Sequence, residues 1–325
     1  MKRSAVVTLL AGACLAAAAA PAIAQVWSPT KPIKLIVTYA PGGSADVLAR
    51  LLQEPLTKNL GQPVVVENRA GAGGNVGSQA IARSEPDGHT VGIGAVSTHA
   101  INPALFGDKL PFRVPQDFTS IGQILFQPNV IVVHPSVPAY TPMEFIAWLK
   151  QSPGTPFGTA GIGSSNHLTG ELINMQFGVK LQHTAYKSGG LALQDLMAGH
   201  IKIVIDNITT AARLVQDGKA RAIAVSTAKR SSILPNTPTF AESGAPRFDL
   251  SSWQGLFGPA GMPKPAVDRW HAELVRALGD PSVRERLAAF GAEIAPTTPA
   301  EFSAFINDEL KKWGEIVRAS GAKVE

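Results

Sequence analysis

The sequence has almost no cysteine, since Cys14 is the only one among its 325 residues. Cys14 falls inside an N-terminal segment that we expect to be removed on export, so the mature chain contains none. Such a chain forms no disulfide, and its fold must be stabilised by the size of its core. The content of 45% hydrophobic residues fits a globular protein and argues against global disorder.

Charge is also scarce, because Asp, Glu, Lys and Arg make up only 16% of the residues. The formal net charge is +5, and it falls to +3 when the two charges of Lys2 and Arg3 are subtracted with the N-terminal segment. The positive residues form no block, which argues against nucleic acid as a partner and weakly favours small anions. The seven histidines are dispersed without the spacing of metal ligands, so we expect no metal site.

Nucleotide-binding motifs are missing as well. The Gly-rich segment 67–77 (ENRAGAGGNVG) lacks the Gly-Lys-Ser/Thr ending of a phosphate-binding P-loop. It also does not match the Gly-x-Gly-x-x-Gly motif with an acidic residue about twenty positions later. We therefore expect no cofactor here, and the loop forms either a wall of a pocket or a structural helix entry.

A long apolar run occurs at the N-terminus, from Ala5 to Ala20. It follows Lys2 and Arg3 and precedes Ala22-Ile23-Ala24, which is an A-x-A cleavage pattern. The run is shorter than a membrane anchor usually needs. We predict a signal peptide over residues 1–24, cleavage before Gln25, and localisation in a bacterial periplasm.

The rest of the chain is organised around the segment 33–50 (IKLIVTYAPGGSADVLAR). The run Leu35–Val37 predicts a buried strand, and Gly42-Gly43 predicts a sharp turn. We expect Ser44 to be the N-cap of the following helix and Asp46 to lie in its first turn. The start of such a helix presents free backbone amides, which favours an anion site.

The segment 157–168 (FGTAGIGSSNHL) repeats this pattern of strand, small residues and helix. Ser164 or Ser165 is expected to cap the helix, which gives a second helix start suited to an anion. His167 is open to three interpretations, as a ligand donor, a catalytic base or a buried helix residue. The loops after Val37, Val66 and Ala95 should also meet at one crevice, because ligands bind at the carboxyl ends of strands in open α/β sheets.

Asp206 follows a predicted strand and has two possible roles. It accepts a hydrogen bond from an amine or hydroxyl of a ligand, or it caps the helix expected near Thr209. The sequence pattern favours neither role over the other.

Seven segments together resemble one family, the Bug-type periplasmic solute-binding proteins of tripartite tricarboxylate transporters. They cover nearly the whole mature chain with family-like spacing, and they are residues 39–46, 66–77, 86–90, 102–105, 161–168, 186–190 and 206–207. The chain departs from the family pattern at Leu191, which replaces a common proline, and at Ser188-Gly189, which reverses the usual order.

The resemblance implies an α/β fold of the type II-like periplasmic binding proteins, in which two domains enclose a ligand cleft. Domain 1 would comprise residues 25–124 and 226–325, and domain 2 residues 125–225. The resemblance also implies a monomer that works with the membrane permease subunits of a tripartite transporter.

Ligand-binding residues are carried over from the same resemblance. The resemblance implies that residues 39–44 and residues 161–165 with His167 face each other across the cleft and hold a carboxylate through backbone amides, hydroxyls and bridging waters. Asn68, Thr98 and Tyr186 would line the same cleft. Asp206 occupies a position that contacts the polar group of amino-acid ligands in some members. The expected ligand-binding set is Tyr39, Ala40, Pro41, Gly42, Gly43, Ser44, Asn68, Thr98, Gly161, Gly163, Ser164, Ser165, His167, Tyr186 and Asp206.

We therefore expect a solute receptor that captures a small carboxylate by hinge closure and is not an enzyme. The ligand stays open between a dicarboxylate, a tricarboxylate, an acidic amino acid and an aromatic carboxylate. One alternative is a sensor accessory that reports its ligand to a membrane receptor. A serine hydrolase using Ser164 or Ser165 with His167 and Asp206 is disfavoured, because the G-x-S-x-G elbow is missing.

Overall fold

The computed structural model describes residues 27–245, 248–320 and 322, so the predicted signal peptide lies outside the described residues. The strands are β1 Ile33–Val37, β2 Val64–Asn68, β3 Thr90–Ala95, β4 Phe118–Val133, β5 Thr155–Thr159, β6 Leu181–Ala185, β7 Ile203–Asn207, β8 Arg221–Val225, β9 Ser251–Pro259 and β10 Glu293–Ile294. The helices are α2 Ser44–Leu60, α3 Asn75–Ala82, α4 Asn102–Phe106, α5 Pro142–Gln151, α6 Ser165–Phe177, α7 Gly189–Met197, α8 Ile208–Gln216, α9 Lys264–Gly279, α10 Pro281–Ala289 and α11 Pro299–Ser320. Short helical turns are η2 Ala72–Gly74, η3 Ser97–Ile101, η4 Gly107–Lys109 and η5 Ala241–Ser243.

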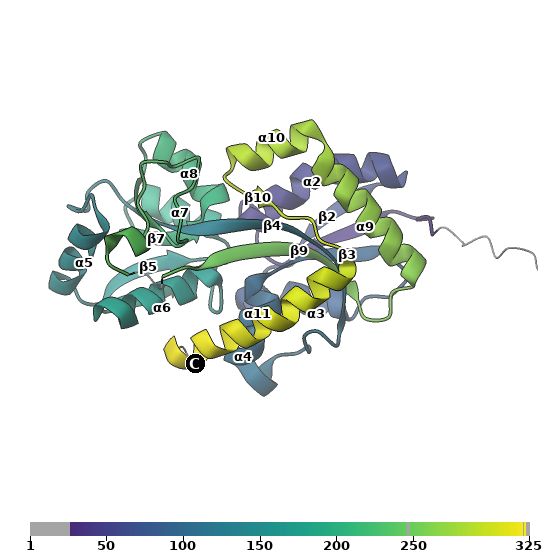
Figure 1. The fold of residues 1–325 in the computed structure, drawn as a ribbon, viewed down its shortest axis with the longest axis horizontal. Coiled ribbons are helices and arrows are strands. Elements are labelled where there is room, and N and C mark those ends of the chain that lie inside the picture. The colour runs from purple at the N-terminus through teal and green to yellow at the C-terminus, as the bar shows by residue number, and fades with distance from the viewer. Residues whose placement is uncertain (1–26, 246–247, 321, 323–325) are drawn as a thin grey trace, which may run out of the picture.

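A mixed sheet forms the centre of the molecule, with strand order β2-β1-β3-β9-β4-β7-β5-β6 (Figure 1). Residues 118–128 of β4 pair with β9, whereas residues 129–133 pair with β7 and β8. The strand β4 thus leads from one half of the sheet to the other. We call residues 27–128 and 251–320 lobe 1, and residues 129–225 lobe 2. The described residues 226–245 and 248–250 belong to the second connection between them.

Burial explains why the central strands form. The strand β1 lies between the parallel strands β2 and β3, and Leu35, Ile36 and Val37 are all buried. A continuous apolar run is typical of a strand covered on both faces. The buried stripe of α2 packs with α9 in one apolar cluster, in which Leu52 and Trp270 take part.

Two side-chain hydrogen bonds fix the start of α5, the first helix of lobe 2. The hydroxyl of Thr141 accepts a hydrogen bond from the amide of Glu144 (3.2 Å), and the Glu144 carboxylate accepts one from the amide of Tyr140 (2.7 Å). Pro142 is the first helical residue, where its missing amide costs nothing. Thr141 is thus the N-cap of α5, and Glu144 holds the residue before it.

The predicted N-cap of α2 is wrong by one residue. Gly43 occupies the N-cap position with extended backbone angles, and Ser44 is the first residue of the helix. The Ser44 side chain makes no cap hydrogen bond, because its hydroxyl is bonded to residues that lie far away in the sequence. These partners form a network that is treated below.

A buried carboxylate attaches the C-terminal helix α11 to the sheet. Glu309 accepts hydrogen bonds from the indole nitrogens of Trp253 and Trp313, both at 2.8 Å. Replacement of Glu309 by leucine should lower the free energy of unfolding by about 2–4 kcal/mol, since it leaves two buried donors without an acceptor. Urea denaturation measures this loss, and Glu309→Gln, which keeps an acceptor oxygen, should retain most of the stability. A leucine variant as stable as the wild type would contradict this role.

Candidate functional site

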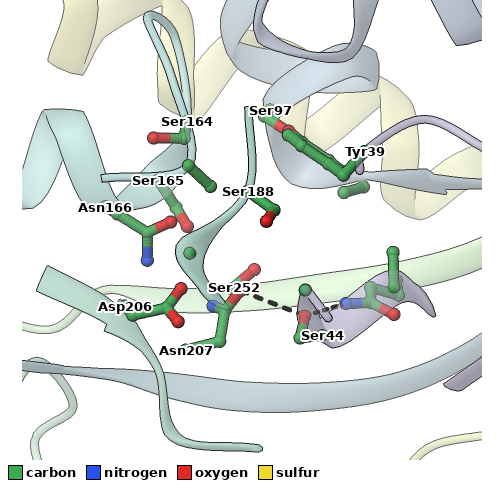
Figure 2. Close-up of a pocket in the computed structure, with 16 residues that line it drawn as sticks. Tyr39, Ser44, Ser97, Ser164, Ser165, Asn166, Ser188, Asp206, Asn207 and Ser252 are labelled. Atoms are coloured by element: carbon green, nitrogen blue, oxygen red, sulfur yellow. Dashed lines mark hydrogen bonds between the residues drawn. The ribbon is translucent and has the colours of Figure 1, made fainter. Parts of the chain in front are cut away.

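A small polar cavity lies between the two lobes (Figure 2). Its volume of about 30 Å³ is the space of one or two water molecules or of a single carboxylate group. Both lobes contribute to its wall, and lobe 1 does so partly through the strand β9. The lining residues are Tyr39, Gly43, Ser44, Ala45, Ala95, Ser97, Ala160, Ser164, Ser165, Asn166, Ser188, Gly189, Asp206, Asn207, Ser252 and Gln254.

Three helices start at this cavity. Ser44 begins α2 in lobe 1, while Ser165 and Gly189 begin α6 and α7 in lobe 2, and all three residues line the wall. The first amides of a helix have no acceptor within the helix, and its N-terminus carries partial positive charge. Three converging helix starts therefore create a site for an anion that requires no cationic side chain.

The serine caps of lobe 2 order these helix starts. The hydroxyl of Ser164 accepts a hydrogen bond from the amide of His167 (3.1 Å), and that of Ser188 accepts one from the amide of Leu191 (3.4 Å). Each cap satisfies an amide of the first turn, and the first residue of each helix lies in the cavity wall. The prediction that Ser164 or Ser165 caps α6 is confirmed, with Ser164 in that place.

Among the residues that the structure describes, no lysine, arginine or histidine lines the cavity. Its ionisable groups are Tyr39 and Asp206. Burial raises the pKa of Tyr39 to about 12, so its hydroxyl stays neutral and hydrogen-bonds with Ser97 at 2.6 Å. Backbone dipoles and neutral hydroxyls thus dominate the electrostatics of the wall, with Asp206 as its single carboxyl group.

Asp206 is the penultimate residue of β7 and is only 2% exposed. Burial raises the pKa of Asp206 to about 6, although hydrogen bonds from Thr210 and Asn207 oppose the effect. Gly189 packs directly on this carboxyl group, and a β-carbon there would clash with it. The N-cap of α8 is Asn207, so the expectation that Asp206 caps this helix is wrong.

A wider groove adjoins the cavity and shares Tyr39 and Ala160 with it as a common wall. The groove has a volume of about 400 Å³ and lies between the Gly71–Gly74 loop of lobe 1 and lobe 2. Apolar and aromatic groups line much of it, among them Ile162 and Tyr186. An elongated ligand can therefore place one polar end in the cavity and its body in the groove.

The structure distributes the predicted site residues over three places. The cavity wall contains Tyr39, Gly43, Ser44, Ser164, Ser165 and Asp206, and the groove contains Gly161 and Tyr186 in addition to Tyr39. The loops after β1 and β3 reach the cavity and the loop after β2 reaches the groove, so their predicted convergence is confirmed. Neither space is lined by Ala40, Pro41, Gly42, Asn68, Thr98, Gly163 or His167.

Asn68 and Gly42 support the first loop from behind. Asn68 donates hydrogen bonds to the carbonyl oxygen of Tyr39 and to the Asp46 carboxylate, both at 3.0 Å. The amide of Gly42 donates to the same carboxylate at 3.0 Å. Burial raises the pKa of Asp46, but the hydrogen bonds from Arg50, Gly42 and Asn68 outweigh it and hold the pKa below its usual value.

Ala40 and Pro41 contact the opposite lobe instead of the cavity. The amide of Ala40 donates to the carbonyl oxygen of Lys187 (3.2 Å). The hydroxyl of Ser188 donates to the carbonyl oxygen of Pro41 (3.4 Å). Gly190 packs so closely on Gly42 that a β-carbon would clash with its carbonyl group. These contacts join the lobes at the edge of the cavity.

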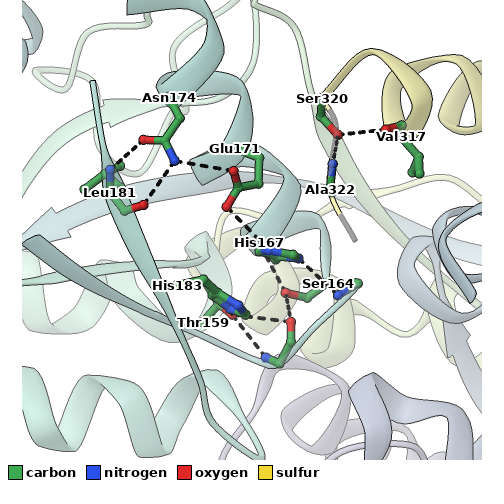
Figure 3. Close-up of polar contacts among 12 residues, drawn as sticks. Thr159, Ser164, His167, Glu171, Asn174, Leu181, His183, Val317, Ser320 and Ala322 are labelled. Atoms are coloured by element: carbon green, nitrogen blue, oxygen red, sulfur yellow. Dashed lines mark hydrogen bonds and ion pairs between the residues drawn. The ribbon is translucent and has the colours of Figure 1, made fainter. Parts of the chain in front are cut away.

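His167 lies behind the Gly161–Ser165 loop, within a cluster in lobe 2 (Figure 3). Its Nδ1 accepts a hydrogen bond from the amide of Gly163 (3.3 Å), and its Nε2 lies 3.6 Å from the Glu171 carboxylate. The ring stacks on His183 at 4.0 Å. Burial lowers the pKa of His183 to about 3, and the neighbouring His167 lowers it further. His167 is thus a buried residue that orders the loop.

Thr98 does not line the cavity, and it lies in a π-helical turn, Ser97–Ile101, that follows β3. The Thr98 hydroxyl bonds to the carbonyl oxygen of Ala95 (3.2 Å) and to Nδ1 of His99 (2.8 Å), and the residue is fully buried. Its neighbour Ser97 lines the cavity.

The remaining lining residues were not predicted as part of the site. They are Ala45, Ala95, Ser97, Ala160, Asn166, Ser188, Gly189, Asn207, Ser252 and Gln254. For Ser252 and Gln254 the sequence does offer a signal, because polar residues two positions apart in a strand face the same side of the sheet.

Two further properties of the described residues limit the chemistry. No group of three or more His, Cys, Asp or Glu side chains in residues 27–245, 248–320 and 322 is placed to hold a metal ion. Within the same ranges, no helix is both long and apolar enough to span a bilayer.

Comparison with known proteins agrees with this geometry. Residues 48–322 match the family described as "Tripartite tricarboxylate transporter family receptor". Protein BugT of Bordetella pertussis is 35% identical over 308 residues, which are 94% of each chain. The structure of periplasmic binding protein BugD has a TM-score of 0.88 at 31% identity and covers 91% of this chain and 100% of that chain. The structure of R. palustris Rpa4515 with adipate has a TM-score of 0.87 at 32% identity, and the match covers 91% of this chain and 99% of that chain.

Proposed function

The chain belongs to the tripartite tricarboxylate transporter receptor family, and we propose that it binds one carboxylate group of a small organic acid in the cavity between its lobes. It is a periplasmic solute-binding receptor with the α/β fold of the Bug-type binding proteins, as the sequence resemblance predicts. Members of this family are binding proteins, so the expectation that the chain is not an enzyme is confirmed.

The convergence of three helix starts is the observation that carries this proposal. The first amides of α2, α6 and α7 would donate to the two carboxylate oxygens, with bridging waters where the distance is too long. Because the amides are fixed by their helices, little entropy is lost when the ligand binds. The size of the cavity, about 30 Å³, fits a single carboxylate group.

The body of the ligand would extend past Tyr39 into the adjoining groove of about 400 Å³. Lys187 lies in the lining of this groove and offers a cation to a second carboxylate. The structure of Rpa4515, which is 32% identical, contains adipate, a chain with a carboxylate at each end. We therefore propose a dicarboxylate as the ligand class.

Ligand capture would proceed by hinge closure of lobe 2 on lobe 1, with bending at residues 128–129 and in the segment 226–245. We propose that the predicted domains, residues 25–124 with 226–325 and residues 125–225, are the units that move. A ligand that touches α2 in one lobe and α6 and α7 in the other favours the closed arrangement, because it gains all its contacts only there. The closed receptor would deliver the ligand to membrane permease subunits, or report it to a membrane sensor.

A thermal-shift screen of residues 25–325 against small carboxylates tests the function. A ligand at 100 times its dissociation constant should raise the free energy of unfolding by about 2.7 kcal/mol, which is several degrees in Tm. We expect a shift with at least one linear dicarboxylate and none with the corresponding diamide. Equal shifts with both, or no shift with any carboxylate, would contradict the proposed ligand class.

A further inference from the structure

The hydroxyl of Ser44 is fully engaged in hydrogen bonds within the protein. It donates to Oδ1 of Asn207 (3.2 Å) and accepts from Nε2 of Gln127 (3.1 Å) and Nε2 of Gln254 (2.5 Å). A serine hydroxyl offers one donor and two acceptor positions, so these partners use all of them. In this arrangement Ser44 can serve a ligand through its backbone amide but not through its hydroxyl.

The partners of Ser44 come from different parts of the molecule. Ser44 starts α2 in lobe 1, whereas Asn207 ends β7 in lobe 2, and Figure 2 shows the bond between them. Gln127 lies on β4, next to the point where this strand passes between the lobes. Its amide group contacts both sides, since Nε2 donates to Ser44 and Oε1 accepts from the hydroxyl of Thr209 in lobe 2 (2.7 Å).

Asn129, two residues further along β4, connects the same network to the start of α6. Its side-chain oxygen accepts hydrogen bonds from Nδ2 of Asn207 (2.9 Å), from Nδ2 of Asn166 (3.0 Å) and from the hydroxyl of Ser165 (3.3 Å). Asn129 is fully buried, and Gln127 is 1% exposed. A continuous chain of polar groups thus joins the starts of α2 and α6 through the strand that connects the lobes.

We propose that Ser44, Gln127 and Asn207 form a latch that stabilises the closed arrangement of the lobes and thereby raises ligand affinity. The inference rests on the proposed hinge closure, and it assigns Gln127 as a positioning residue that does not line the cavity. Opening of the lobes separates Ser44 from Asn207 and draws Gln127 away from one of its two partners. The polar groups of buried Gln127 and half-buried Ser44 and Asn207 then lose each other as partners, which disfavours the open arrangement.

The chain offers a matched pair of variants for a test. Gln127→Leu removes the bridging amide, while Gln123→Leu removes another glutamine of β4 that is equally buried, at 1% exposure. The side-chain nitrogen of Gln123 makes no hydrogen bond within the described residues. We expect Gln127→Leu to weaken carboxylate binding about tenfold, mainly through faster dissociation, and Gln123→Leu to leave it within twofold. Equal effects of the two substitutions would overturn the latch.

The distance between the lobes can be measured in the ligand-free protein, so this test of the latch does not depend on which ligand binds. The chain from residue 25 onward has no cysteine, so Glu85→Cys in lobe 1 and Lys150→Cys in lobe 2 accept one spin label each without background. We expect double electron–electron resonance to show a short-distance population that decreases in Gln127→Leu and is retained in Gln123→Leu. Identical distance distributions in all three proteins would overturn the proposal, whatever the ligand is.

A double-mutant cycle distinguishes the latch from direct ligand contact by the Ser44 hydroxyl. In a latch, Ser44→Ala breaks the bonds to both Gln127 and Asn207, and Gln127→Leu breaks the first of these as well, so the loss of affinity in the double variant should be smaller than the sum of the two single losses. Additive losses would show that the Ser44 hydroxyl acts on the ligand independently, and this result would contradict the latch.

Discussion

Replacement of Ala160 by tryptophan should lower affinity for the carboxylate ligand at least 100-fold. Ala160 lies where the cavity and the groove meet, and it is part of the wall of both. An indole there would occupy the passage between a space of about 30 Å³ and one of about 400 Å³. The ligand would then be unable to place its carboxylate at the helix starts and its body in the groove at the same time.

Isothermal titration calorimetry with a dicarboxylate measures this effect. Ala147→Trp is a suitable control, because Ala147 is an exposed alanine on α5 of the same lobe. The control should bind like the wild type, and both variants should unfold at a similar urea concentration. Wild-type affinity in a folded Ala160→Trp variant would place the ligand outside this cleft.

Asp206→Asn should change both ligand affinity and stability, in a manner that depends on pH. With its pKa raised to about 6, Asp206 is largely ionised at pH 8 and lies in the same wall as the helix starts that attract the ligand. A plain dicarboxylate should therefore bind more weakly as the pH rises above 6, by up to about tenfold per pH unit. A ligand with an ammonium group should show the opposite slope, and both slopes should disappear in Asp206→Asn.

The same substitution should stabilise the protein without ligand. The pKa of Asp206 rises from 3.8 in the unfolded chain to about 6 in the fold, so the folded state loses stability as the pH increases from about 4 to about 6. At pH 7 this cost is fully present, and its removal should increase the free energy of unfolding by up to about 3 kcal/mol. Urea titrations at pH 4 and pH 7 measure the difference. A gain at pH 4 as large as that at pH 7 would contradict the assigned pKa.

Local sequence patterns predicted the strand ends and helix starts that surround the site. The alternation of apolar runs with Gly-rich turns indicated strands that end beside helix starts, and the cavity lies at such a point. Ser164 caps α6 as expected, because an N-cap depends only on residues within one turn of the helix. The family resemblance, carried by the same loops, supplied the fold and the receptor function.

Contacts between distant segments account for what the sequence did not predict. Ser44 was expected to cap α2, but its hydroxyl binds Gln127 and Gln254, which lie 83 and 210 residues away. A polar residue at a helix start looks like a cap in the sequence even when tertiary partners engage it. Thr98 was predicted to be in the site, but Ser97 lines the cavity instead. The chain forms a π-helical turn after β3, and strand periodicity does not indicate which side chains of such a turn face the cavity.

Amide chemical shifts test most directly whether a carboxylate binds at the converging helix starts. In a titration of ¹⁵N-labelled protein with the dicarboxylate found in the screen, we expect the largest downfield amide proton shifts at Ser44, Ser165 and Gly189. A surface groove between α2, α9 and α10 provides the contrast, since it contains the cations Lys58 and Arg276 and has a volume of about 470 Å³. Largest shifts in that groove, with unchanged amides at the three helix starts, would contradict carboxylate binding between the lobes.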